Sequence, residues 1–226
     1  MDCRHELKFL ITDVQLEQLN ARIEHLCRPD KNQKDADGYT ITSLYFDTPY
    51  DRLLQESLDG VDRRHKYRLR CYDRDPSLVK LERKSKFHGM TAKLAVTATQ
   101  KEWLLLRQGD CPRLQPDHVQ EKQELLCQMQ MYGLLPKTIV EYHRKAFVYP
   151  LGNVRITFDR NICASRDVNA FGSSTYHTVP LLGAGVHILE VKYDNLLPGF
   201  IRDALQTECL QRTSYSKYVQ SRLKLG

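Results

Sequence analysis

Charged side chains at every second position mark two neighbouring segments as candidates for binding chemistry. Residues 66–70 read Lys-Tyr-Arg-Leu-Arg, and residues 80–84 read Lys-Leu-Glu-Arg-Lys after a turn at residues 73–77. In a β-strand, side chains at alternate positions point to the same face of the sheet. Each segment therefore predicts a face of Lys and Arg side chains, with Glu82 among them. Such a face could bind phosphate groups, since arginine forks match phosphate oxygens in a bidentate manner.

The same alternation is typical of an ordinary solvated sheet, so a single hairpin does not decide between the two interpretations. The pattern repeats, however, in residues 4–11, 154–160 and 186–193. The charged positions are mostly cationic, and in several segments a single carboxylate accompanies them, namely Glu6, Glu82 and Glu190. A pattern repeated in so many strands indicates that the charged faces point in one common direction.

Eight segments are predicted to be strands because they alternate in polarity or are rich in β-branched and aromatic residues. The predicted strands are residues 4–11, 39–47, 66–72, 79–84, 91–97, 138–149, 154–160 and 186–193. The predicted helices are residues 14–26, 99–107, 118–132, 198–210 and a final helix capped by Thr213-Ser214. Residues 28–38 and 161–185 are expected to be loops, and residues 50–57 fit either a short helix or a turn.

The predicted helices carry apolar stripes, and the apolar faces of the strands are their natural partners. The charged faces must then point to solvent or into an interior. The sequence therefore predicts an α+β fold in one domain over residues 1–226, with an antiparallel barrel of about eight strands closed around the charged faces. A lumen lined by Lys and Arg requires a polyanion, and Mg²⁺ or Mn²⁺ would join carboxylate to phosphate oxygens.

Composition narrows the classes of partner and the cellular setting. The formal net charge of +6 agrees with a polyanionic ligand. No run of about 18 apolar residues occurs, so no membrane insertion is expected. The first residues lack the apolar stretch of a signal peptide, and the seven cysteines include no Cys-x-x-Cys pair; both features predict a cytoplasmic protein with reduced thiols. The strands show no row of exposed aromatic residues for stacking bases, so nucleic acid is not an expected partner.

Several of these segments, taken in order, resemble the motifs of a known family. They are residues 4–8, 43–48, 67–72, 81–84, 89–93, 142–147, 154–159, 189–192 and 214–218. Together they span nearly the whole chain and resemble the polyphosphate polymerase domain of the vacuolar transporter chaperone (VTC) family. That family belongs to the wider triphosphate tunnel metalloenzymes.

The resemblance implies a set of site residues within a tunnel. The implied catalytic residues are Arg68, Arg70, Lys84, Arg144 and Arg155. The implied phosphate-binding residues are Lys8, Lys93, Tyr142, Lys192, Ser216 and Lys217. Glu190 is the implied metal ligand, while Glu6 and Glu82 are alternative ligands that we expect instead to orient nearby lysines. Alternation alone groups Arg144 with apolar neighbours, so its selection depends on the resemblance.

The resemblance also implies a reaction, in which the terminal phosphate of a nucleoside triphosphate, ATP above all, is transferred to a growing polyphosphate chain with Mn²⁺ or Mg²⁺. The related cyclase and thiamine-triphosphatase branch opens with Glu-x-Glu-x-Lys, whereas Arg4 stands here in place of the first Glu. This difference favours the polymerase over a metal-dependent tripolyphosphatase or nucleoside triphosphatase. A non-catalytic module that binds or senses polyphosphate is the other alternative. The membrane helices of eukaryotic members have no counterpart here, so any membrane or export partner would be a separate chain.

Overall fold

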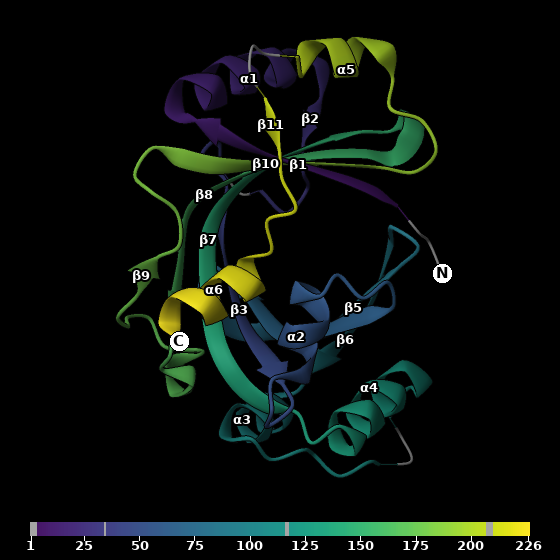
Figure 1. The fold of residues 1–226 in the computed structure, drawn as a ribbon, viewed down its shortest axis with the longest axis vertical. Helices are drawn as coiled ribbons and strands as arrows, with labels where there is room; N and C mark the ends of the chain where they lie inside the picture. The colour runs from purple at the N-terminus through teal and green to yellow at the C-terminus, as the bar shows by residue number, and fades with distance from the viewer. Residues whose placement is uncertain (1–3, 34, 116–117, 207–209) are drawn as a thin grey trace.

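The computed structural model describes residues 4–33, 35–115, 118–206 and 210–226, and they form one large antiparallel sheet with helices packed around it (Figure 1). The strands are β1 (His5–Thr12), β2 (Arg28–Pro29), β3 (Tyr39–Asp47), β4 (Arg64–Tyr72), β5 (Asp75–Phe87), β6 (Met90–Ala98), β7 (Leu135–Tyr149), β8 (Val154–Ser165), β9 (Val179–Pro180), β10 (Val186–Tyr193) and β11 (Gln211–Arg212). The helices are α1 (Asp13–Leu26), α2 (Arg52–Leu58), α3 (Gln100–Gln108), α4 (Gln120–Met131), α5 (Gly199–Ala204) and α6 (Lys217–Leu225).

The predicted closed barrel of about eight strands is wrong. The described residues form an 11-stranded sheet whose main path runs β11-β1-β10-β8-β7-β3-β4-β5-β6. The edge of β1 that faces away from β10 is partly paired. Strand β11 pairs with Phe9 and Leu10, and the Thr213 amide donates to the Lys8 carbonyl at 2.9 Å. Among the described residues, the backbone pairing between β6 and this end of the sheet is limited to an isolated bridge between Arg4 and Thr91, so the barrel is not closed.

Several predicted boundaries also differ from the structure. Residues 161–165, expected in a loop, continue β8, and residues 50–57 resolve into a turn followed by α2. The predicted helix over 198–210 is the shorter α5, and its predicted part at 207–209 lies outside the described residues. The final helix begins one turn beyond the predicted cap, because the Ser216 hydroxyl accepts from the Val219 amide at 3.3 Å and acts as the N-cap.

Helices α1, α3 and α4 cover the apolar outer face of the sheet, as the polarity pattern predicts, whereas α6 packs Tyr218 and Val219 on an apolar cluster of the inner face. Helix α1 starts with a capping box between Thr12 and Gln15 and buries Leu19 and Ile23 against the outer side of β8 and β10. At the other end of the molecule, α3 and α4 pack on β4, β5 and β6 (Figure 1). Arg83, a charged residue on this apolar face, donates to Glu124 and Gln128 of α4 at 2.6 and 2.5 Å.

The covered outer face leaves the opposite, inner face of the sheet to the charged residues. The sheet curves enough for Lys84 of β5 to reach Glu6 of β1, although five strands separate these two along the sheet path. Within the described residues, no helix is both long enough and apolar enough to cross a membrane. Five cysteines in this part of the chain are free thiols, while Cys3 and Cys209 lie outside it.

Candidate functional site

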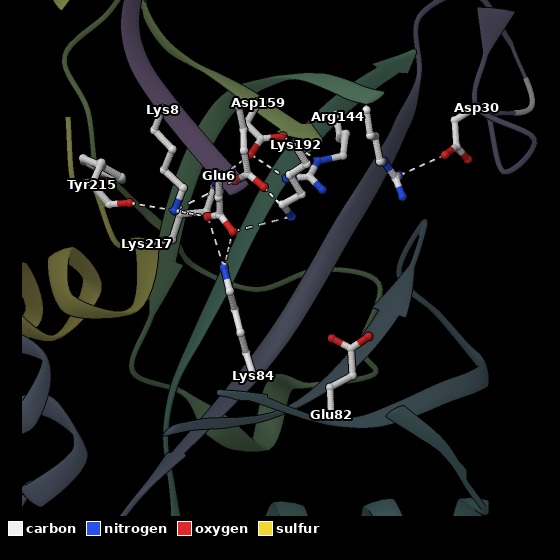
Figure 2. A network of polar contacts seen from close by, with 12 residues as sticks. Glu6, Lys8, Asp30, Glu82, Lys84, Arg144, Asp159, Lys192, Tyr215 and Lys217 are labelled. Carbon is white, nitrogen blue, oxygen red and sulfur yellow. Dashed lines mark hydrogen bonds and ion pairs between the residues drawn. The ribbon is translucent and has the colours of Figure 1, made fainter. Parts of the chain in front are cut away.

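Two glutamates and three lysines form a compact network on the inner face, which we name the lysine cluster. Lys84 Nζ lies 2.7 Å from Glu6 Oε2, and Lys8 Nζ lies 2.9 Å from Glu6 Oε1. Lys192 Nζ lies 2.5 Å from Glu190 Oε1. Longer contacts of 3.9 and 4.0 Å join Lys8 to Glu190 and Lys192 to Glu6. Figure 2 shows Glu6 between Lys8 and Lys84, so β1, β5 and β10 meet here.

The charges of this cluster depend on one another. Burial and the nearby Glu190 carboxylate would both raise the pKa of Glu6, but Lys84, Lys8 and Lys192 together hold it well below its ordinary range. Burial likewise opposes the charge on Lys8, and Glu6 and Glu190 overcome it and raise the pKa of Lys8. Glu6 is therefore a carboxylate and Lys8 an ammonium ion at neutral pH.

A second network, the arginine cluster, surrounds Glu82. Arg68 donates from Nε and Nη2 to Glu82 Oε2 at 2.8 and 2.7 Å, and Lys93 Nζ lies 3.3 Å from Oε1. Arg70 is held more loosely: its nearest contacts are Ser43 Oγ at 3.4 Å, Tyr142 at 3.5 Å and Glu82 at 3.7 Å. Burial would raise the pKa of Glu82, yet the three cations lower it well below its ordinary range.

A third network is centred on Asp159, which is fully buried. Arg144 donates to both carboxylate oxygens of Asp159, from Nε to Oδ1 at 2.6 Å and from Nη2 to Oδ2 at 2.8 Å. Lys217 Nζ lies 2.5 Å from Asp159 Oδ2. The cations of Arg144 and Lys217 also lie over the Tyr142 ring, 5.2 and 4.5 Å from its centroid. Asp159 was not among the predicted site residues, although alternation with Arg155 placed it on the charged face.

Arg155 is positioned by residues that sequence reasoning missed. Its Nη2 donates to the Tyr39 hydroxyl at 3.0 Å and lies 3.1 Å from Asp30 Oδ2. Asp30 belongs to a segment predicted as a loop, and its place comes from a backbone bond to the Ala146 carbonyl at 2.9 Å. No spacing in the sequence links Asp30 to Arg155, so only the fold could identify this partner.

The start of α6 lies against strands from opposite parts of the sheet. The Lys8 ammonium donates to the Tyr215 carbonyl at 3.2 Å, and the Lys66 ammonium donates to the Ser216 hydroxyl at 2.8 Å. The next residue, Lys217, reaches Asp159 on β8. The predicted residues Ser216 and Lys217 are therefore brought to the inner face, and Lys66 joins them although it was not predicted as a site residue.

All the predicted phosphate-contacting and metal-ligating residues lie in these connected networks. The cations of the networks are Lys8, Lys66, Arg68, Arg70, Lys84, Lys93, Arg144, Arg155, Lys192 and Lys217. The carboxylates are Glu6, Asp30, Glu82, Asp159 and Glu190. Ten basic side chains against five carboxylates leave a positive excess, even though burial lowers the pKa of Lys66 and of Lys84 to about 7, and an anionic ligand would neutralise this excess.

The carboxylates differ in their fitness to bind a divalent metal. Mg²⁺ and Mn²⁺ commonly use one or two carboxylates together with substrate phosphate oxygens. Glu6 and Glu190 fit this role, because they share Lys8 and Lys192 and are held by mobile ammonium groups. Glu82 fits less well, since the planar guanidinium fork of Arg68 binds its Oε2 through two N–H groups and fixes its orientation. The described residues contain no group of three His, Cys, Asp or Glu side chains suited to a metal, so the remaining ligands would be phosphate oxygens or water.

Comparisons with known proteins identify one family. The VTC domain profile matches residues 3–225. No curated protein matches the chain. Among solved structures, the PH1819 protein of Pyrococcus horikoshii OT3 aligns at 14% identity with a TM-score of 0.48, covering 99% of both chains. A putative adenylate cyclase of Bacillus halodurans aligns at 12% identity with a TM-score of 0.46, covering 98% of this chain and 88% of the other. Structural likeness this low adds nothing to the functional argument.

Proposed function

Because this chain belongs to the VTC domain family, we propose that its inner face binds a chain of phosphate groups and a nucleoside triphosphate. The observation that carries the proposal is the convergence of ten cations from seven strands and α6 on one face of the sheet. A linear polyanion matches this arrangement because its charge is distributed along its length, as the cations are along the inner face.

We further propose that the reaction is phosphoryl transfer from ATP to the end of a polyphosphate chain. Such a reaction asks the protein chiefly for positioning and for neutralisation of charge. The acceptor is an ionised phosphate oxygen, so no general base is required. Hydrolysis would require a base to take a proton from water, and the ion pairs that lower the pKa of Glu6 and Glu82 make these carboxylates weak bases.

The arginines have distinct roles in this proposal. Arg70 makes the weakest contacts with protein groups, so its guanidinium is the one most available to a phosphate. Arg68 donates two N–H groups to Glu82, and Arg144 donates two to Asp159. Both arginines would therefore bind phosphate through their remaining N–H groups. Glu82 and Asp159 would thus fix the orientation of these forks before the ligand arrives.

Mg²⁺ or Mn²⁺, held by Glu190 with Glu6, would supply charge neutralisation for the leaving diphosphate. Lys8 and Lys192, which contact both glutamates, and Lys84, which contacts Glu6, would stay close to the same oxygens. These lysines keep the two carboxylates from repelling an approaching phosphate chain.

The test is incubation of the purified protein with ATP and Mn²⁺, with assays for long-chain polyphosphate, ADP and free phosphate. Polymer together with ADP is the expected result, and the Arg70→Met variant should form none. As a matched control, Lys101→Met removes an exposed cation of α3 and should leave the polymer yield unchanged.

Other outcomes would replace the proposal with a different function. ADP and free phosphate without polymer would assign a tripolyphosphatase. Tight binding of polyphosphate without turnover would assign a sensing role. Absence of any phosphate binding would overturn the whole proposal, whereas loss of catalysis alone would leave the binding face in place.

A further inference from the structure

Lys66 differs from every other cation of the inner-face networks. Each of the other nine has a carboxylate oxygen within 4.0 Å. Lys66 has no such partner among the described residues, and its ammonium group instead donates to the Ser216 hydroxyl at 2.8 Å and lies 6.0 Å from the Tyr218 ring centroid. It lies on β4 with the parity of Arg68 and Arg70, which places it on the inner face.

The surroundings of Lys66 are unfavourable for a positive charge in the free protein. Burial is the largest cause, and the nearby Lys8, Lys84 and Arg64 add repulsion that Glu6 only partly offsets; together these lower the pKa of Lys66 to about 7. A buried charge without a counter-charge is destabilising. A ligand that brings negative charge to this position would supply the missing counter-charge.

Ser216 provides a second, independent indication of a ligand. Its oxygen accepts from the Lys66 ammonium and from the Val219 amide, which uses both of its lone pairs. The hydroxyl hydrogen remains, and no acceptor for it occurs among the described residues. Lys66 and Ser216 therefore lie side by side, from β4 and from the start of α6, and among the described residues neither the Ser216 hydroxyl hydrogen has an acceptor nor the Lys66 ammonium a carboxylate partner.

We propose that Lys66 is a further phosphate ligand, which binds one phosphate group of the polyanion together with Ser216, a residue that the family resemblance already implies in phosphate binding. This inference rests on the proposed binding of phosphate chains. Lys66 is a binding residue in this scheme, since its ammonium group would contact a non-bridging phosphate oxygen directly. The ammonium group of Lys8 donates to the carbonyl of Tyr215, the residue that precedes Ser216.

The test uses titration calorimetry with inorganic tripolyphosphate on the full chain and on the Lys66→Met variant. Loss of one charge-assisted hydrogen bond should weaken binding about tenfold. Lys101→Met, which removes a cation elsewhere, should bind as the wild type does. Thermal unfolding supplies a second readout: without ligand, Lys66→Met should melt at the same or a higher temperature, because it removes an uncompensated buried charge.

Opposite effects on stability and affinity would separate a binding role from a structural one. Unchanged affinity in Lys66→Met, while Arg70→Met binds weakly, would overturn the assignment of Lys66 and leave the proposed function standing. A lower melting temperature of the free variant with unchanged affinity would assign Lys66 a purely structural role. No binding of tripolyphosphate by the wild type would overturn the proposed function itself, and this assignment with it.

Discussion

The lysine cluster and the arginine cluster bring similar charges together by different means. In the arginine cluster, Arg68 and Glu82 are directly opposite on neighbouring strands, and Lys93 lies on the next strand. In the lysine cluster, Lys84 meets Glu6 only because the sheet curves back on itself. One cluster is thus a product of local strand pairing, whereas the other depends on the shape of the whole sheet.

The two clusters also differ in how their carboxylates are held. Glu82 is the sole carboxylate of its cluster and is bound to a planar guanidinium fork, which fixes its orientation. Glu6 and Glu190 share Lys8 and Lys192, and Glu6 also binds Lys84; the ammonium groups of these lysines are point charges on flexible stems. We infer that the arginine cluster is built to hold phosphates in a fixed place, and the lysine cluster to rearrange around phosphate and metal.

The largest expected effect that separates the clusters is on stability. Glu82→Gln would leave the buried Arg68 and Arg70 without their carboxylate, and it should lower the free energy of unfolding by about 3–5 kcal/mol. Glu6→Gln should cost clearly less, because Glu190 remains close to Lys8 and Lys192. Urea denaturation at neutral pH measures both. An equal or larger loss in Glu6→Gln would contradict the distinction between the clusters.

The next effect is on affinity within the arginine cluster. Arg70→Met should weaken binding of tripolyphosphate about 100-fold, because two charge-assisted hydrogen bonds from a buried fork are lost. Lys93→Met should weaken it less than tenfold, since 53% of the Lys93 side chain is exposed and solvent screens its charge. Calorimetry gives both affinities. If Lys93→Met proved the more damaging, Arg70 would not be the principal phosphate ligand.

A metal effect should be confined to the lysine cluster. Mn²⁺ should strengthen binding of tripolyphosphate by the wild type, and Glu190→Gln should abolish that increase while retaining the metal-free affinity to within a few-fold. Lys93→Met is the matched control, because it changes an inner-face residue but leaves both metal-ligand candidates intact. A full Mn²⁺ response in Glu190→Gln would exclude this carboxylate as the metal ligand.

The smallest expected effect is a dependence of stability on pH. Ion pairs lower the pKa of Glu6 from its ordinary value of 4.5 in the folded protein, despite its burial. The unfolded chain then binds more protons than the folded one at acidic pH, so this stabilisation is present above about pH 5 and is lost as the pH falls. Denaturant midpoints between pH 6 and 3 should fall more steeply in the wild type than in Glu6→Gln. Parallel slopes would contradict the lowered pKa of Glu6.

The site residues differ in how far the sequence alone could identify them. Alternation within one hairpin was enough to place Arg68, Arg70 and Glu82 on a common face, because strand geometry is periodic over a few residues. Arg144 required family motifs, since the residues next to it also carry charge. The alternation placed Lys66 on the same face as Arg68 and Arg70 but did not mark it as a site residue. Its lack of a carboxylate partner depends on which residues surround it in the folded protein, and the sequence does not show this.

What the sequence by itself determined is the sheet-rich fold with covering helices, the face on which each strand carries its charges, and membership of the family. What only the tertiary structure decided is which charges meet. Lys84 reaches Glu6, Asp159 binds Arg144 and Lys217, and Asp30 holds Arg155, although long stretches of chain separate these partners. The sheet stays open: β11 pairs with two residues of β1, and β6 reaches this end of the sheet through the isolated bridge between Arg4 and Thr91. Side-chain direction follows from local backbone geometry, whereas contacts between distant strands depend on the curvature and edge pairing of the complete sheet.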